Sequence, residues 1–138
     1  MTNILADSGV ITAFLNEQDQ WHKPVKDIFL RLPKPFITCE AVITEVCYLL
    51  RSTFIGEKAV LDFVANNVLR LDFSLSEEVG RVMSLMKKYE DVPMSLADAC
   101  LVRMSELYTD SAVFTIDSDF QVYRRDRNKS VPYIDPRQ

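Results

Sequence analysis

Short apolar runs alternate with longer amphipathic segments along most of the chain. Runs with strand character occupy residues 4–6, 36–38, 68–73, 112–116 and 131–134. Between them, apolar residues recur at helical spacing, as Val10, Ile11 and Phe14 do after the first run. Because strands that alternate with helices are typical of α/β folds, we expect a mostly parallel sheet of four to five strands with helices on both faces.

Local signals set the expected ends of the helices. Helices are expected over residues 22–32, 40–52, 60–64 and 95–108. Another is expected to begin at Ser76, a residue type that favours the N-cap position. In the helix over 95–108, Arg103 and Glu106 mark the expected outer face. A basic stretch at residues 124–129 precedes the last apolar run.

Composition limits the class of protein. The 138 residues, 48% of them apolar and 26% charged, predict a single globular domain over 1–138. Three glycines are too few for a Walker A loop or a GxGxxG motif, which removes the usual forms of P-loop hydrolysis and dinucleotide-dependent redox chemistry. The net charge of -4 provides no global basic field, so any binding of nucleic acid must rely on local cations or bound metal.

Cysteine usage and hydropathy indicate the compartment. Cys39, Cys47 and Cys100 include no CxxC pair, and we expect reduced thiols in a cytoplasmic protein. A structural zinc site is not expected from scattered cysteines and the lone His22. No apolar run approaches the roughly 20 residues of a membrane-spanning helix, so no membrane association is expected.

Two aspartates end apolar runs with strand character. Asp7 follows the first run and Asp117 follows the run at 112–116. If these two strands are neighbours in a parallel sheet, the carboxylates lie close together at the edge where such sheets bind ligands. The alternative for Asp7 is a helix N-cap, and the alternative for Asp117 is a turn, a role that Asp119 could also fill.

Two further acids lie on the inner sides of expected helices. Glu45 lies at the edge of an apolar stripe that includes Val46 and Leu49, and an ion pair with an arginine is as good an explanation as a functional role. Asp98 faces inward, but it also has the spacing of a capping box with Ser95. Taken together, clustered carboxylates require a cation, and ligation by oxygen alone indicates Mg²⁺ or Mn²⁺.

The ordered set of motifs resembles the PIN-domain family of metal-dependent ribonucleases, especially the compact VapC-type toxins. The resemblance covers nearly the whole chain. The matching stretches are Leu5-Ala6-Asp7-Ser8, Thr44-Glu45-Val46, Asp91-Val92-Pro93-Met94-Ser95-Leu96-Ala97-Asp98-Ala99 and Thr115-Ile116-Asp117-Ser118-Asp119-Phe120. The resemblance implies a three-layer α/β/α sandwich with a parallel sheet. It also implies metal binding by Asp7, Glu45, Asp98 and Asp117, with Asp119 as an auxiliary ligand.

Further roles follow from the same resemblance. Ser8 and Thr115 are expected to support the acids, whereas Ser95 stands where many relatives carry an acid. The implied activity is endonucleolytic cleavage of single-stranded RNA with one or two Mg²⁺ or Mn²⁺ ions, which would acidify a water molecule and stabilise the transition state. Glu45 would bind metal or orient that water. The implied partners are an antitoxin protein and a second copy of the chain.

Two alternatives remain open. The protein could act as a binding module through apolar residues of the segment 40–67, but core packing is the favoured interpretation of these side chains: Tyr48, Phe54, Ile55 and Phe63. The basic cluster could bind RNA, but a solvated turn is favoured for a run this short: Arg124, Arg125, Arg127 and Lys129. A receiver domain or a haloacid-dehalogenase-type phosphatase fits less well, because Ser8 and Gly9 follow Asp7.

Overall fold

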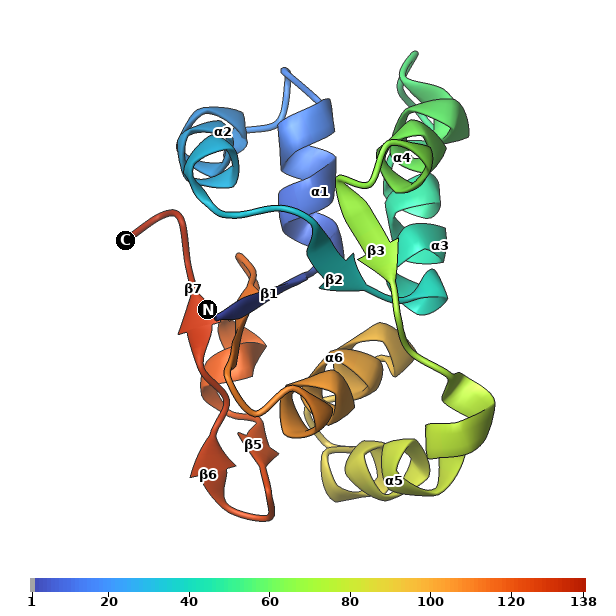
Figure 1. Ribbon diagram of the computed structural model, residues 1–138, viewed down its shortest axis with the longest axis vertical. Coiled ribbons are helices and arrows are strands. Elements are labelled where there is room, and N and C mark those ends of the chain that lie inside the picture. The colour runs from blue at the N-terminus through green and yellow to red at the C-terminus, as the bar shows by residue number, and fades with distance from the viewer. Residues whose placement is uncertain (1) are drawn as a thin grey trace.

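Five parallel strands form the central sheet in the computed structural model, which describes residues 2–138 (Figure 1). The strands are β1 (Asn3–Ala6), β2 (Phe36–Thr38), β3 (Leu69–Leu71), β4 (Ser111–Phe114) and β7 (Tyr133–Ile134). They lie in the order β3-β2-β1-β4-β7, and each neighbouring pair is parallel. The expected parallel sheet is therefore confirmed, and β1 and β4 are neighbours.

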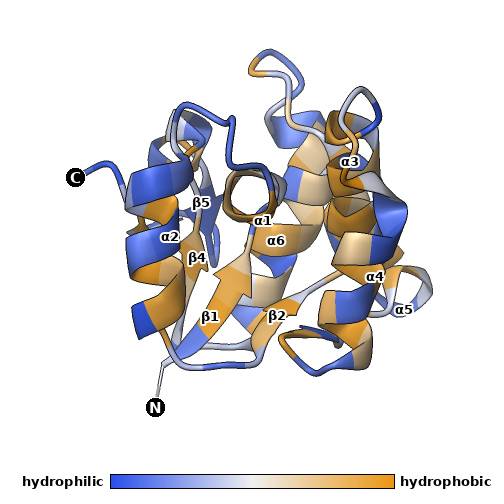
Figure 2. Cartoon of the chain, turned by 90° about the horizontal axis from the view of Figure 1, so that it is seen from above, coloured by the Kyte–Doolittle hydropathy of each residue, from blue (hydrophilic) through white to orange (hydrophobic). Residues whose placement is uncertain are grey.

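Six α-helices complete the layers within the described residues. They are α1 (Ser8–Leu15), α2 (His22–Arg31), α3 (Glu40–Leu49), α4 (Gly56–Ala65), α5 (Leu75–Lys88) and α6 (Leu96–Leu107). In Figure 1, α1 to α4 lie on one side of the sheet and α5 and α6 on the other. Figure 2 shows hydrophobic strands at the centre and a hydrophilic outer side on α2. This arrangement confirms the three-layer α/β/α sandwich.

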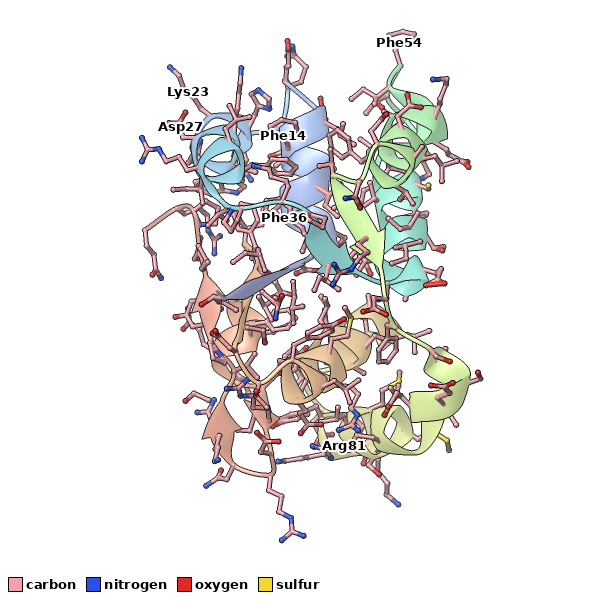
Figure 3. The ribbon with its side chains drawn as sticks, in the orientation of Figure 1. Phe14, Lys23, Asp27, Phe36, Phe54 and Arg81 are labelled. Carbon is pink, nitrogen blue, oxygen red and sulfur yellow. The ribbon has the colours of Figure 1, made fainter. Side chains whose placement is uncertain are left out.

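An aromatic cluster fixes α1 and α2 on the sheet. The rings of Phe14 in α1 and Phe29 in α2 stack with centroids 3.9 Å apart, and Phe29 meets Phe36 of β2 edge-on at 4.8 Å (Figure 3). Phe114 of β4 lies 5.8 Å from Phe36. Such pairs stabilise a fold beyond the burial of their area. The cluster therefore packs the end of α1 against α2 and the sheet.

Three local expectations were wrong. Helix α5 begins at Leu75 because the hydroxyl of Ser74, not Ser76, accepts a hydrogen bond from the Glu77 backbone N–H. Helix α3 ends at Leu49 rather than at residue 52, and Leu49, which was expected in its apolar stripe, is 42% exposed. The side chain of Glu106 is only 4% exposed and lies against α5 instead of facing solvent.

The segment after β4 is more structured than the sequence predicts. A 3₁₀ helix, η1 (Ser118–Gln121), is followed by the antiparallel strands β5 (Arg124–Arg125) and β6 (Lys129–Ser130). Positive φ angles of 48° at Asp126 and 76° at Arg127 form the turn between them. The basic stretch is therefore a hairpin, at the bottom of Figure 1.

Within residues 2–138, no helix combines the length and the hydrophobicity needed to cross a bilayer.

Candidate metal centre

The parallel pairing of β1 and β4 brings the carboxyl ends of these strands together. Ala6 pairs with Phe114, Asp7 follows β1 directly, and Asp117 comes three residues after β4. Within the sheet, β2 lies next to β1 on one edge of that strand, and β4 lies next to it on the other edge. This is the topological switch point at which α/β sheets bind ligands.

Asp7 is held by hydrogen bonds to both of its carboxylate oxygens. It is the N-cap of α1, where its Oδ1 accepts a bond of 2.7 Å from the Ser8 backbone N–H. Its Oδ2 accepts a bond of 2.7 Å from the hydroxyl of Thr115. The same hydroxyl accepts a bond of 2.9 Å from the Asp117 backbone N–H. Asp7 is thus a cap and a site residue at once, and Thr115 links it to Asp117.

The turn into α1 requires close approach to the segment that leads to Asp117. A Cβ atom at Gly9 would lie 2.9 Å from Cγ1 of Ile116, which is closer than ordinary side chains tolerate. Glycine therefore allows α1 to begin directly against the residue before Asp117. The Ser8-Gly9 pair, unremarkable in the sequence, positions two acids relative to each other.

Asp98 reaches the same place from the opposite layer. It lies in the first turn of α6, where the hydroxyl of Ser95 accepts a bond of 3.0 Å from its backbone N–H. Its Oδ2 accepts a bond of 2.8 Å from the hydroxyl of Tyr123. Carboxylate oxygens of Asp7, Asp98 and Asp117 all lie within 4.8 Å of one another. We call these three residues the acid cluster.

Burial and mutual repulsion raise the pKa values of Asp7 and Asp98 in the acid cluster. Burial, together with the charges of Asp98 and Glu45, raises the pKa of Asp7 to about 7, although the hydrogen bonds from Thr115 and Ser8 act to lower it. Burial and the charge of Asp117 also raise the pKa of Asp98, against the effect of its bond from Tyr123. Carboxylates in this situation need a proton or a cation to be stable.

The described residues supply no salt bridge to compensate this charge; Arg137, whose pKa is raised mainly by its hydrogen bond to Asp135 and also by the charge of Asp117, is already paired with Asp135. Among residues 2–138, none of the ion pairs involves a member of the acid cluster or Glu45. The donors are all carboxylate oxygens, which Mg²⁺ and Mn²⁺ prefer. The buried position, the raised pKa values and the donor set therefore all fit a divalent cation held by Asp7, Asp98 and Asp117.

Glu45 and Asp119 occupy different positions from the acid cluster. Glu45 is half-buried on α3, and its Oε1 accepts a hydrogen bond from the hydroxyl of Ser8. Its charge contributes to the raised pKa values of Asp7 and Asp98, so it lies near both. Asp119 donates its backbone N–H to Asp117 Oδ1 at 2.9 Å, and its carboxylate is not among the three that converge.

Tyr123 is the site residue that sequence reasoning missed. Its side chain is fully buried, and its ring packs edge-on against Phe120 and Tyr89, each with centroids 5.2 Å away. Burial and the neighbouring Asp98 raise the pKa of the Tyr123 hydroxyl, so that it remains a hydrogen-bond donor. A lone tyrosine in front of a basic stretch carries no sequence signal for this role.

Two arginines of the hairpin are occupied by the fold. Arg124 donates from Nη1 to the backbone carbonyls of Gln121 and Tyr123 at 2.9 and 3.0 Å. Arg125 donates to the carbonyls of Ser105 and Thr109 at 2.8 and 3.3 Å. These guanidinium groups fasten the hairpin to its neighbours, which favours the structural interpretation of the basic stretch.

Comparison with known proteins agrees with this fold. The profile of the PIN domain family matches residues 4–126. Among curated proteins, none matches the chain by sequence. Among solved structures, the Mycobacterium tuberculosis toxin VapC20 is similar at a TM-score of 0.75 and 19% identity, over 87% of this chain and 94% of that one. FitAcB from Neisseria gonorrhoeae is similar at a TM-score of 0.58 and 18% identity, over 98% and 99% of the two chains.

The parallel sheet with convergent acids at its switch point thus defines an α/β protein with a candidate metal centre. The match over residues 4–126 goes further: this chain belongs to the PIN domain family.

Proposed function

We propose that this protein is a divalent-metal-dependent endoribonuclease that hydrolyses phosphodiester bonds of single-stranded RNA. The observation that carries the proposal is the convergence of three carboxylates within 4.8 Å, without a cationic side chain to pair with them. Membership of the PIN domain family supports it. So does the solved structure of VapC20, which is described as a toxin that cleaves the sarcin–ricin loop, since that protein shares this fold.

Each residue of the site has a proposed task. Asp7, Asp98 and Asp117 would hold Mg²⁺ or Mn²⁺, with Asp119 as an auxiliary ligand. Bound there, the cation would acidify water and neutralise charge that develops on the phosphodiester. Glu45, held by Ser8, lies at the rim of the acid cluster, where its carboxylate can bind metal or accept a proton from the attacking water. Thr115 and Tyr123 fix the orientation of the acids through their hydroxyl groups.

The biological setting that we propose is a toxin–antitoxin pair. VapC20 is a toxin of the same fold, and the motifs of this chain resemble those of VapC-type toxins. The proposed partners are an antitoxin protein and a second copy of the chain. Exposed apolar side chains on and near α3 and α4 offer surface for such contacts: Leu49, Phe54 and Leu61.

A binding module is the second candidate function. It is favoured by the exposure of Tyr48 at 59% and Phe54 at 110%, since both were expected to pack in the core. Ile55 and Phe63 do pack against the core as expected. A module would need no acid cluster, which is why we place the enzyme first.

The decisive experiment is cleavage of a mixed pool of single-stranded RNA by purified protein. Mn²⁺, Mg²⁺ and EDTA are compared, and the Asp7→Asn/Asp98→Asn double variant controls for contaminating nuclease. We expect cleavage that requires metal and disappears in the folded double variant. Equal activity of the variant and the wild type would reject the assignment. If no cleavage occurs under any condition, the binding module becomes the better description.

A further inference from the structure

A hollow of about 440 Å³ lies between α3 and the start of α6. Its wall includes Ala41, Thr44, Glu45 and Tyr48 from α3, and Leu96 and Ala97 from α6. Glu45 belongs both to this wall and to the surroundings of the acid cluster, and Ala97 precedes Asp98 in the chain. The volume lies within the range of roughly 300–1,000 Å³ typical of ligand pockets. An RNA strand that binds at the acid cluster could therefore extend into the hollow.

Tyr48 presents an aromatic ring to this hollow. It follows Glu45 by three residues, so the two side chains are neighbours on one face of α3. The Tyr48 residue is 59% exposed, and Leu96 on the opposite wall is 41% exposed. Proteins that bind single-stranded nucleic acids stack bases on aromatic side chains, because every base has an apolar face.

Arg51 places a cation against the ring of Tyr48. Its guanidinium carbon lies 3.7 Å from the centroid of the Tyr48 ring, and its Nη1 donates to the Tyr48 carbonyl at 2.7 Å. The guanidinium thus stacks on the ring and helps to fix its orientation. Because Arg51 stacks on a residue that lines the hollow, its remaining N–H donors lie next to the place where an adjoining phosphate would come.

We propose that the hollow binds one base of the RNA strand, stacked on Tyr48, with Arg51 next to an adjoining phosphate. The inference rests on the proposed function, because the base lies on the strand whose phosphodiester is cut at the acid cluster. RNA fits the hollow better than a protein segment does, since the hollow shares Glu45 with the surroundings of the acid cluster and its aromatic ring, Tyr48, is stacked with the guanidinium of Arg51. Tyr48 is thereby a substrate-positioning residue.

The test compares three single variants in steady-state cleavage of a short single-stranded RNA with Mn²⁺. Tyr48→Leu removes the ring, and we expect a KM about 10-fold higher with kcat within about 2-fold, the loss of one stacked base. Tyr48→Phe keeps the ring and should retain the wild-type KM. Phe54→Leu is the matched control, because Phe54 is also an exposed aromatic residue but lies outside the hollow, at the top of Figure 3.

The outcomes separate this inference from the proposed function. If the wild type cleaves RNA and Tyr48→Leu has an unchanged KM, the base site is rejected and the nuclease stands. Equal losses in Tyr48→Leu and Tyr48→Phe, or in Phe54→Leu, would also reject stacking at this position. If the wild type binds RNA without cleaving it, Kd values from fluorescence anisotropy replace KM in the same comparison. Failure of the wild type both to cleave and to bind RNA overturns the two proposals together.

Discussion

Helix α6 carries a poorly exposed carboxylate near each end. The surroundings disfavour the negative charge at one end and stabilise it at the other. Near its start, Asp98 faces other acids, and burial together with the charge of Asp117 raises its pKa. Near its end, Glu106 accepts bonds of 2.9 and 2.7 Å from Arg81 and one of 3.1 Å from Arg103. Although burial opposes the effect, these hydrogen bonds lower the pKa of Glu106.

The comparison shows which acid is structural and which is available for function. The charge of Glu106 is neutralised within the protein, where Arg81 spans from α5 to α6 (Figure 3). Arg103 extends the same network to Glu78 at 2.7 Å. The acid cluster has no such partner among the described residues. An uncompensated group of buried acids at a switch point is a candidate for a site completed by an external cation.

The largest effect is expected from Asp98→Asn. The change preserves the shape of the side chain and one oxygen that can accept from Tyr123, but it removes the charge of a metal ligand, so metal-dependent RNA cleavage should fall by about 1,000-fold. The free energy of unfolding measured in EDTA should not decrease, because one of the repelling charges is gone. Cleavage rates with Mn²⁺ and urea unfolding in EDTA check the two parts. Wild-type activity in the folded variant would contradict the role of Asp98 as a metal ligand.

The opposite result is expected from Glu106→Gln on the same helix. Removal of this charge leaves Arg81 and Arg103 without their partner, which should lower the free energy of unfolding by about 3 kcal/mol. Cleavage per folded molecule should stay within about 2-fold of the wild type, since Glu106 lies at the far end of the helix. Urea unfolding and cleavage at a temperature at which the variant is folded are the measurements. Loss of cleavage without loss of stability would show that the two ends do not have separate roles.

The acid cluster, through Asp7, and Glu106 should also respond oppositely to pH. The pKa of Asp7 in the folded protein is about 7, above its ordinary value of 3.8, so its contribution to stability is present at acidic pH and is lost as the pH rises toward 7. The lowered pKa of Glu106 acts in reverse, and its contribution is lost as the pH falls below its ordinary value of 4.5. In EDTA, raising the pH from 5 to 8 should therefore destabilise the protein by about 2 kcal/mol through Asp7.

Urea unfolding as a function of pH tests this prediction in three samples. The wild type in EDTA should lose stability from pH 5 to 8, and Asp7→Asn should lose less, because only the contribution of Asp98, whose pKa is also raised, remains. Saturating Mn²⁺ should remove the loss in the wild type, since a cation that binds only the folded, ionised site stabilises it. The same slope in the wild type and in Asp7→Asn would assign the pH dependence to another group.

The sequence predicted the features that depend on local pattern. Apolar runs and helical spacing were sufficient for the parallel sheet, and the strand ends placed Asp7 and Asp117 at one edge of it. Asp98 follows from the inner side of α6 and from its cap at Ser95. Membership of the PIN domain family agrees with the motifs that contain these acids. Short-range periodicity fixes such positions because each depends on a few neighbouring residues.

Contacts between segments distant in sequence could not be predicted in this way. Glu106 was placed on the outer face because a helical wheel does not show that α5 brings Arg81 against it, 25 residues earlier in the chain. The Tyr123–Asp98 bond likewise joins residues 25 apart, through a hairpin that the sequence does not indicate. Tertiary packing determines both the Glu106–Arg81 and the Tyr123–Asp98 contacts. It also determines which acid is neutralised by arginine and which is not.

The smallest effect that we predict concerns this missed contact. Tyr123→Phe removes the hydroxyl that donates to Asp98 at 2.8 Å but keeps the ring against Phe120. Loss of such a supporting bond to a metal ligand should weaken Mn²⁺ binding by about 10-fold. It should also lower the free energy of unfolding by about 1 kcal/mol. Mn²⁺ titration of RNA cleavage measures the apparent affinity.

Tyr89→Phe is the matched control for this change. The Tyr89 side chain is also buried, but its hydroxyl accepts a bond of 2.8 Å from the Arg124 backbone N–H instead of touching an acid of the site. We expect a similar small loss of stability and no change in apparent Mn²⁺ affinity. If both variants weaken Mn²⁺ binding equally, the effect of Tyr123 arises from general packing around η1. A shift confined to Tyr123→Phe would show that the hydroxyl orients Asp98, which makes the hairpin segment part of the support for the metal centre at the start of α6.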